Sequence, residues 1–260
     1  MTSNKSQRFY LALIGFIIVL IVWQSVIWIF DLPAFLFPSP MSVVKRSLEL
    51  GKNWLPHIWG TVYGTLLGFF IALIAGVILG TLIVHSRVLN LIIMPTLVLL
   101  QIVPKMALAP IILVWAGIGV ASRVSVVALT AFFPIVISTI TGLQSIQPEL
   151  IDLARSMKMN KWHILWKLRL PNSLPHIFSG LKVASTLSVI GSIISEFVGA
   201  QEGIGYIILS AGFVLDTALQ FGGLVVVTLF GVIFYGVIII IEKVSMPWYL
   251  AEVELVESSF

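Results

Sequence analysis

The chain has 260 residues, of which 59% are hydrophobic and 10% are charged, and its formal net charge is +4. A soluble domain carries about 25% charged residues, and a disordered chain combines low hydrophobicity with high charge, so this composition excludes both classes. The absence of Cys excludes disulfides, thiolate catalysis and Cys-based metal sites. The sequence predicts an all-α integral membrane protein of about six transmembrane helices, with residues 1–260 forming one domain.

Two predicted helices precede the core spans. Residues 9–30 contain no charged residue and follow Lys5 and Arg8. This run is longer than the apolar core of a cleavable signal peptide, so we expect a retained first helix with its N-terminus in the cytoplasm. Residues 35–54 mix apolar and charged side chains, which favours an amphipathic helix at the membrane surface.

The core spans are predicted within residues 59–243, and the first of them covers residues 59–84. It carries a small residue at every fourth position. Small residues let a second helix backbone approach closely, which is how spans pack when lipid supplies no hydrophobic drive. The register therefore predicts a tight helix–helix contact along the whole span. Its members are Gly60, Gly64, Gly68, Ala72, Gly76 and Gly80.

Residues 89–120 are apolar but too long for one straight span. Prolines interrupt the run, and Lys105 lies inside it. We expect either one broken or re-entrant span, or a span followed by a short second helix. A fourth run begins at Arg123 and extends to about residue 143. The interrupting prolines are Pro95, Pro104 and Pro110.

The last two spans are expected at residues 177–198 and 221–241, separated by a loop rich in glycine. Lys182 lies near the inner end of the first of these and is expected to snorkel to the interface. With the N-terminus inside, residues 1–8, 85–87, 144–176 and 242–260 are cytoplasmic. They hold more basic residues than the opposite side, as the positive-inside rule requires. The cytoplasmic set is Lys5, Arg8, Arg87, Arg155, Lys158, Lys161, Lys167, Arg169 and Lys243, and the outer set is Lys45, Arg46, Lys52 and Arg123.

Residues 149–176 form the only long polar stretch inside the chain. Pro148, followed by acidic residues, is typical of a helix start, so we expect a first short helix over residues 149–157 and a turn over 158–160. A second helix is predicted over residues 161–168, ending before Pro171. Two short helices with apolar and basic faces would form a protrusion that docks onto a partner protein. A basic loop lying on anionic lipid is the alternative.

This polar segment resembles the coupling loop of ATP-binding-cassette importer permeases, whose pattern is Glu-Ala-Ala, three residues, Gly, nine residues, Ile, one residue, Leu-Pro. Leu153 departs from Ala, and Lys158 replaces the turn Gly. The chain is most similar to binding-protein-dependent permeases for sulfonates, taurine, nitrate, thiamine-precursor pyrimidines and riboflavin. The pattern falls on Asp152, Leu153, Ala154, Lys158, Leu168, Leu170 and Pro171; further matches are Pro38-Ser39-Pro40, Gly68-Phe69, Pro104-Lys105 with Ala107 and Pro110, Trp115-Ala116-Gly117-Ile118-Gly119, Glu196-Phe197-Val198-Gly199-Ala200 and Gly203-Ile204-Gly205-Tyr206.

The resemblance implies the type I importer permease fold in the bacterial inner membrane. It implies a permease for a small solute, such as a sulfonate, a nitrate-like anion or a pyrimidine or vitamin precursor. The implied partners are a cytoplasmic ATPase, an external solute-binding protein and a second permease copy, which would make a homodimer. The chain has no phosphate-binding loop, so it is expected to bind no cofactor, and ATP is used by the ATPase subunit. The implied coupling residues are Asp152, Leu153, Ala154, Arg155, Met157, Lys158, Leu170 and Pro171.

Three residues are candidates for the solute pathway: Lys105, Trp115 and Glu196. Charges inside a span are expensive and mark functional sites by default. Lys105 lies between two prolines, where it either faces an anionic or carbonyl-rich solute or binds backbone carbonyls freed at the break. Glu196 either seats the external binding protein or pairs with a base such as Arg123. Helix packing explains Trp115 equally well.

Two other classes fit less well. An ion-coupled secondary transporter, the main alternative, calls for paired carboxylates or an inverted repeat. An intramembrane enzyme calls for a Ser/His, paired Asp or metal-ligand cluster inside the spans. Neither explains the polar segment. The four histidines are scattered, so no metal site is predicted, and the basic residues lie between apolar runs, so no nucleic acid is expected as a partner.

Overall fold

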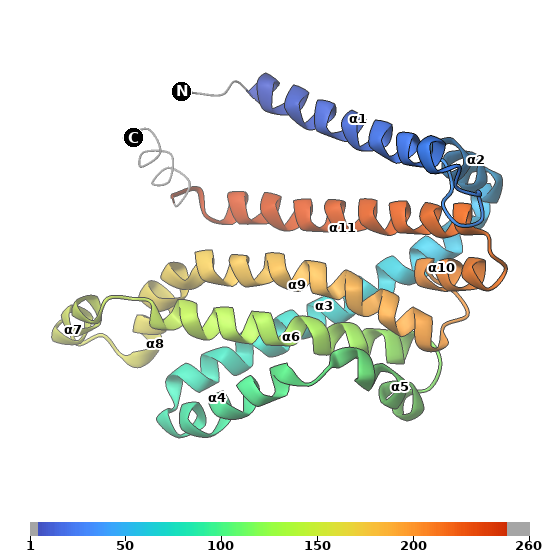
Figure 1. Cartoon of the computed structure of the whole chain (residues 1–260). Helices are drawn as coiled ribbons and strands as arrows, with labels where there is room; N and C mark the ends of the chain where they lie inside the picture. The colour runs from blue at the N-terminus through green and yellow to red at the C-terminus, as the bar shows by residue number, and fades with distance from the viewer. Residues whose placement is uncertain (1–4, 249–260) are drawn as a thin grey trace.

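The computed structural model describes residues 5–248, which fold into α-helices joined by short turns (Figure 1). Five helices are long and apolar enough to cross a membrane, or six if one bent pair counts as a single span, which confirms the predicted fold class. The helices are α1 (Lys5–Phe30), α2 (Pro40–Leu50), α3 (Trp54–His85), α4 (Arg87–Ile102), α5 (Lys105–Ala116), α6 (Val120–Gln144), α7 (Pro148–Ser156), α8 (Lys161–Ile164), α9 (Leu170–Gly199), α10 (Ile204–Phe213) and α11 (Thr217–Ser245), with a 3₁₀ turn η1 (Gly51–Asn53) and a π-helical stretch η2 (Leu165–Arg169).

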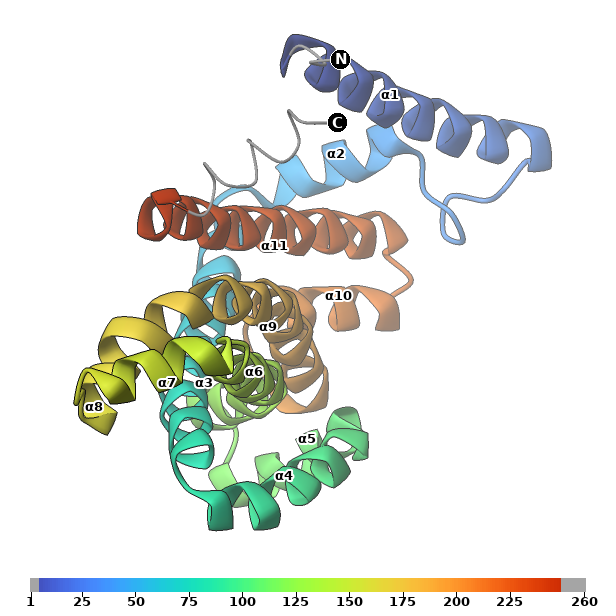
Figure 2. The ribbon, with the colours of Figure 1, turned by 90° about the vertical axis from the view of Figure 1, so that its left-hand side faces the viewer.

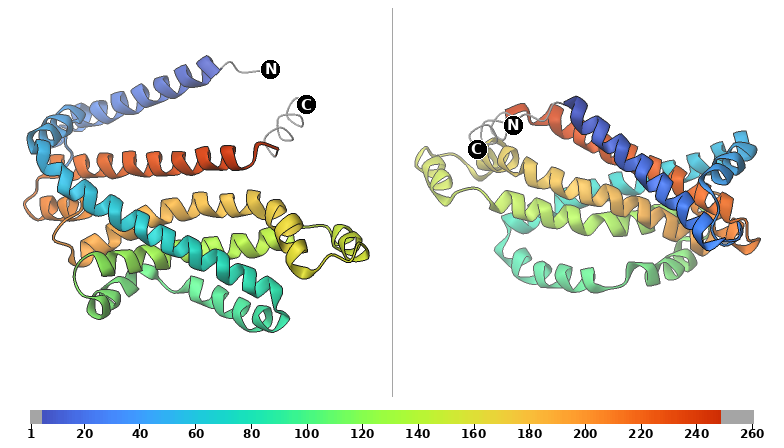
Figure 3. Two further views of the ribbon diagram at one scale, coloured as in Figure 1. Left: turned by 180° about the vertical axis from the view of Figure 1, so that it is seen from behind. Right: turned by 45° about the horizontal axis from the view of Figure 1, so that its top comes forward.

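The long helices run side by side, and their connections gather at two ends (Figures 1 and 3). One end holds the start of α1, the end of α11, the α3–α4 turn and the pair α7–α8; we call it the inner end. The opposite end holds α2 and α10, and we call it the outer end. This grouping matches the predicted topology, in which the N-terminus and the polar segment share one side.

The predicted glycine register of α3 packs against α6. A methyl group added to Gly68 would lie 2.6 Å from Val127 Cβ, and one added to Gly80 would lie 2.8 Å from Thr139 Cβ. Both distances are shorter than a normal carbon–carbon contact. The two backbones therefore approach as closely as the register predicted.

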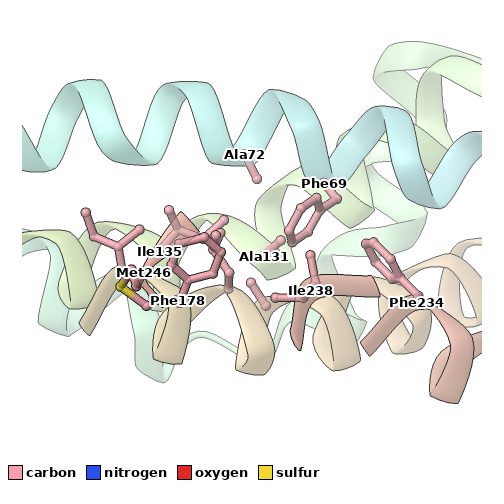
Figure 4. Close-up of a cluster of buried hydrophobic side chains, with 11 residues drawn as sticks. Phe69, Ala72, Ala131, Ile135, Phe178, Phe234, Ile238 and Met246 are labelled. Atoms are coloured by element: carbon pink, nitrogen blue, oxygen red, sulfur yellow. The ribbon is translucent and has the colours of Figure 1, made fainter. Parts of the chain in front are cut away.

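The largest buried cluster lies where α3, α6, α9 and α11 meet (Figure 4). Phe69 of α3 and Phe234 of α11 pack edge to face with their ring centroids 5.0 Å apart. Apolar side chains from these four helices thus pack into one cluster, the largest of those that the described residues form. The labelled members are Phe69, Ala72, Ala131, Ile135, Phe178, Phe234, Ile238 and Met246.

The predicted break after α4 is confirmed: α4 and α5 form a pair bent by 97°. The pair lies on the side of the bundle opposite α1 (Figure 2), where Leu97 of α4 and Ala109 of α5 pack against α6. At the outer end, the Trp23 indole of α1 donates to the Pro38 carbonyl at 3.0 Å. The amphipathic helix α2 follows, and its Arg46 bonds Asp216 at the start of α11 at 2.7 Å.

Two local predictions were wrong. The glycine-rich loop contains helix α10, whose Ile208 packs where Gly223 of α11 leaves room. The helix of the polar segment does not end before Pro171 but continues into α9 through η2. Lys182, which was expected to snorkel, has its ammonium 2.7 Å from the carboxylate of Glu242 near the inner end of α11.

Candidate functional site

Helix α7 is the most protruding element of the inner end (Figure 1). Pro148 occupies its first turn beside Glu149, as the sequence indicated. Lys158 follows the helix in the left-handed conformation, with φ of 56°. Its N–H bonds the Arg155 carbonyl at 2.9 Å, and the Met159 N–H bonds the Ala154 carbonyl at 3.0 Å. This is a Schellman motif. The turn glycine of the resembled pattern thus falls where glycine is least strained, and Lys158 adopts the same conformation.

An apolar stripe runs along the outward face of α7. Leu150, Leu153 and Met157 recur at helical spacing and are 45%, 59% and 70% exposed. We call these three residues the α7 stripe. Exposed apolar anchors at this spacing are the pattern with which a short helix fills a groove of a partner protein. Asp152 and Arg155 form an exposed ion pair of 3.2 Å on another side of the same helix.

Three residues of the sequence pattern lie away from this face. Ala154, which the sequence placed on the docking face, is only 3% exposed and is part of the packing beneath the helix. Leu170 and Pro171 are half-buried at the start of α9. The π-helical stretch permits Pro171: the Leu170 N–H bonds the Leu165 carbonyl five residues back, and proline is tolerated at the start of the regular helix that follows.

A buried polar cluster occupies the outer end. Arg123 of α6 and Glu196 of α9 are 3% and 1% exposed, with Arg123 Nε 3.4 Å from Glu196 Oε1. The two terminal nitrogens of Arg123 donate to the carbonyls of Gly60 at 2.5 Å and Glu202 at 2.7 Å. Gly64 leaves space for the same side chain, because an added methyl group would overlap Arg123 Cδ.

Uncharged groups donate the remaining hydrogen bonds to the Glu196 carboxylate. Its carboxylate accepts from the Thr61 hydroxyl at 2.8 Å, the Gly205 N–H at 2.7 Å and the Ser192 hydroxyl at 3.2 Å. The Thr61 oxygen in turn accepts from the Ile204 N–H at 2.8 Å. We call Arg123, Glu196 and Thr61 the outer cluster. Glu196 is therefore a structural ion-pair partner, the alternative that the sequence left open, and this cluster ties α3, α6, α9 and α10 together.

The three pathway candidates do not come together. Lys105 Nζ donates to the Gln101 carbonyl at 3.0 Å and lies 5.3 Å from the centre of the Phe133 ring. This is the backbone-binding alternative that the sequence allowed. Trp115 lies at the other end of α5 and is 81% exposed, whereas Glu196 is enclosed in the outer cluster. Trp115 is the most exposed of the three, and Lys105 is half-buried.

Sequence reasoning missed the partners of the outer cluster. Thr61 and Gly205 are uncharged, and nothing in their spacing links them to Glu196. The available signal was the presence of two charges, Arg123 and Glu196, at the outer ends of two apolar runs. Two charges at one depth are expected to pair, but the spacing does not give the surrounding hydrogen bonds.

Comparisons with known proteins identify a family and several relatives. The sequence profile of the family described as binding-protein-dependent transport system inner membrane component matches residues 64–249. A riboflavin transport system permease protein of Chloroflexus aurantiacus is 34% identical over 93% of this chain and 92% of the relative. A formylaminopyrimidine transport permease protein of Halalkalibacterium halodurans is 30% identical, and the match covers 93% of this chain and 98% of the relative.

A solved structure shares the fold. The chain is similar to one chain of the inward-facing MetNI methionine ABC transporter, with a TM-score of 0.67 and 21% identity. The similarity covers 76% of this chain and 98% of that one. It includes most of the helices described above and extends the type I importer permease architecture to this protein.

Proposed function

The chain belongs to the family of binding-protein-dependent transport system inner membrane components, and from this premise we propose that the α7 stripe seats the ATPase that drives import. The protein is the membrane-spanning permease subunit of an ATP-driven importer, and ATP hydrolysis is carried by a separate subunit. The family description also implies an external binding protein that delivers the solute.

The exposure of the α7 stripe carries this proposal. The three large apolar side chains of the stripe, two on α7 and that of Met157 directly after it, are exposed, which is unfavourable in water. A groove in the ATPase would remove these side chains from water. In this proposal Lys158 sets the turn after α7, while Ala154, Leu170 and Pro171 hold the segment in place.

The path from α7 to the membrane explains how ATPase movement would be transmitted. Residues Lys161–Gly199 form one helical run of 39 residues, about 58 Å at 1.5 Å per residue. This run starts beside α7 and ends at Glu196 in the outer cluster. A displacement of α7 would therefore tilt α9 together with the helices that the cluster ties to it. Such rigid-body rocking alternates access between the two sides of the membrane.

The test measures co-purification of the ATPase with a tagged permease and uptake by cells. We expect Leu153→Asp to release the ATPase and abolish uptake, because a carboxylate in an apolar groove is strongly disfavoured. Val214→Asp is the matched control: Val214 is 74% exposed at the opposite end of the molecule. Retention of the ATPase by Leu153→Asp, in amounts equal to the control, would overturn the assignment of α7.

We further propose that two copies of this chain form the pathway between their α4–α5 arms. The pair α4–α5 packs against α6 with one side and exposes large apolar side chains on the other. A homodimer would cover this surface and enclose a path between the copies. The exposed residues include Leu91, Ile92, Leu99, Ile102, Met106, Val114 and Trp115.

Cross-linking tests the homodimer directly, because the native sequence has no Cys. Val114→Cys, at a side chain that is 81% exposed on α5, is expected to give a disulfide-linked dimer under mild oxidation. Val232→Cys is the control, since Val232 is 64% exposed on α11. Equal yields from both variants would indicate random collision rather than an interface through α5.

For the solute, we propose a small polar compound of the pyrimidine or vitamin-precursor type, following the two relatives named above. Trp115 would stack on a flat ring, and Lys105 would keep a donor available beside its bond to Gln101. Uptake of labelled riboflavin and of a formylaminopyrimidine, compared with taurine and nitrate, tests this choice. Loss of uptake in Trp115→Ala with normal ATPase assembly would support the pathway role.

A further inference from the structure

A cavity of about 590 Å³ opens at the inner end between α3, α7, the α7–α8 turn and η2. Four of its lining side chains are basic or carry an imidazole, namely His85, Arg155, Lys161 and Arg169, and none is acidic. Asn160 adds an amide, and the remaining lining is apolar. The cavity thus combines concentrated positive charge with an apolar wall.

Two of these charges have no anionic partner within the described part of the chain. Lys161 and Arg169 take part in none of the ion pairs or side-chain hydrogen bonds found among residues 5–248. Arg169 is half-buried, so part of its hydration is lost without a compensating contact. Arg155 shares its charge with Asp152 in an exposed pair. An anion in the cavity would supply the missing acceptors.

The cavity faces away from the α7 stripe. On α7 it is lined by Ile151 and Arg155, which are four residues apart and share one side of the helix. The stripe occupies a different side. An ATPase seated on the stripe would leave the cavity open toward the inner ends of the spans.

Aromatic residues place the cavity at the depth of lipid headgroups. Trp162 is 67% exposed and stacks with His85, a lining residue, with the ring centroids 6.1 Å apart. Trp166, one turn further along, is 62% exposed. Exposed tryptophans beside the end of a span are typical of the membrane–water interface. The apolar lining residues Val84 and Ile164 would then meet the glycerol and upper acyl region.

We propose that this cavity binds the phosphate group of an anionic phospholipid from the inner leaflet. Basic pockets between helices on the cytoplasmic side suit such headgroups, and guanidinium geometry matches phosphate oxygens. The bound lipid bridges Lys161 and Arg169 to Arg155 of α7. It thereby fixes α7 against the end of α3, and coupling depends on anionic lipid.

The experiment uses the purified permease–ATPase complex in nanodiscs of phosphatidylcholine with and without phosphatidylglycerol. Native mass spectrometry counts the retained phosphatidylglycerol, and ATP hydrolysis is measured in parallel. We expect Lys161→Gln/Arg169→Gln to weaken the retention of phosphatidylglycerol at least about tenfold. Each basic side chain near an anionic lipid strengthens binding several-fold, and this variant removes two of them. The matched control is Lys167→Gln/Lys243→Gln, which removes the same charge from exposed inner-end residues outside the cavity.

Each other outcome has a defined meaning. Equal retention by the cavity variant and the control overturns the proposal. Displacement of the lipid by excess inorganic phosphate alone, with unchanged ATP hydrolysis, indicates a free-phosphate site and also overturns it. Loss of the ATPase with lipid retained shows that an acidic surface of the ATPase is the occupant. The single variant Lys161→Gln, at an exposed position, provides the same test if the double variant does not fold.

Discussion

At the outer end, Arg123 and Glu196 are 3% and 1% exposed. The groups that form hydrogen bonds with these two side chains belong to this chain. At the inner end, the α7 stripe is about half to two-thirds exposed, and Lys161 and Arg169 have no anionic partner in the described residues. Polar and apolar groups whose partners lie within the chain stabilise the fold. Groups left without partners are available to other molecules, which is why the contact with the ATPase is assigned to the inner end.

The sharpest way to break this comparison is to remove one enclosed charge and one exposed charge. Arg123→Met leaves the Glu196 carboxylate buried and unpaired, so the free energy of unfolding should fall by about 3–5 kcal/mol. Arg46→Met is the matched control. Its ion pairs with Glu49 and Asp216 involve a side chain that is 41% exposed, and its loss should be about 1 kcal/mol or less. Denaturant unfolding in detergent measures both variants, and similar losses would contradict a special role for the outer cluster.

A smaller effect is expected from the close contact between α3 and α6. Gly68→Ala places a methyl group 2.6 Å from Val127 Cβ and 2.8 Å from the Val124 carbonyl oxygen. Overpacking of this kind lowers the free energy of unfolding by about 1–3 kcal/mol. Gly236→Ala on α11 meets nothing within 4 Å and should be neutral or stabilising, because Ala favours helix over Gly. A loss in Gly236→Ala as large as in Gly68→Ala would refute the packing explanation.

At the inner end, Lys158→Gly should stabilise the turn after α7. Lys158 has φ of 56°, and a side chain in this conformation raises the free energy by about 1 kcal/mol or more relative to Gly. Hydrogen exchange of α7 amides should therefore slow down. Lys167→Gly, within the helical stretch η2, is the control and should speed up exchange locally. Faster exchange in Lys158→Gly would show that the Lys side chain itself holds the turn.

The smallest effect on stability is expected in the α7 stripe, where a substitution should have the largest effect on transport. Leu153 is 59% exposed, so Leu153→Asp should change the free energy of unfolding by no more than about 0.5 kcal/mol. Solute uptake by cells that carry this variant should nevertheless be lost. A variant that unfolds more easily would mean that the α7 stripe belongs to the internal packing and not to a docking surface.

The sequence alone determined the membrane class, the order of the spans, the break after α4 and the contact face of α3. These features depend on composition and on local periodicity, which the bilayer and the helix geometry enforce directly. The coupling segment could also be located, because a polar stretch of this length stands out against apolar neighbours. The family resemblance rested on the same local spacing.

Only the tertiary structure decided which side chains have partners inside the chain. Helix α10 is too short to span and has no distinctive period, and its place depends on contacts with α11 such as Ile208 against Gly223. The pairing of Lys182 with Glu242 and of Arg123 with Glu196 joins residues 60 and 73 positions apart. Burial of Ala154 likewise follows from how the inner-end helices fold back. The sequence offered the pairing of Glu196 with Arg123 as one of two alternatives, but the packing of the whole bundle decided between them. The other contacts join distant residues, and no local pattern in the sequence records them.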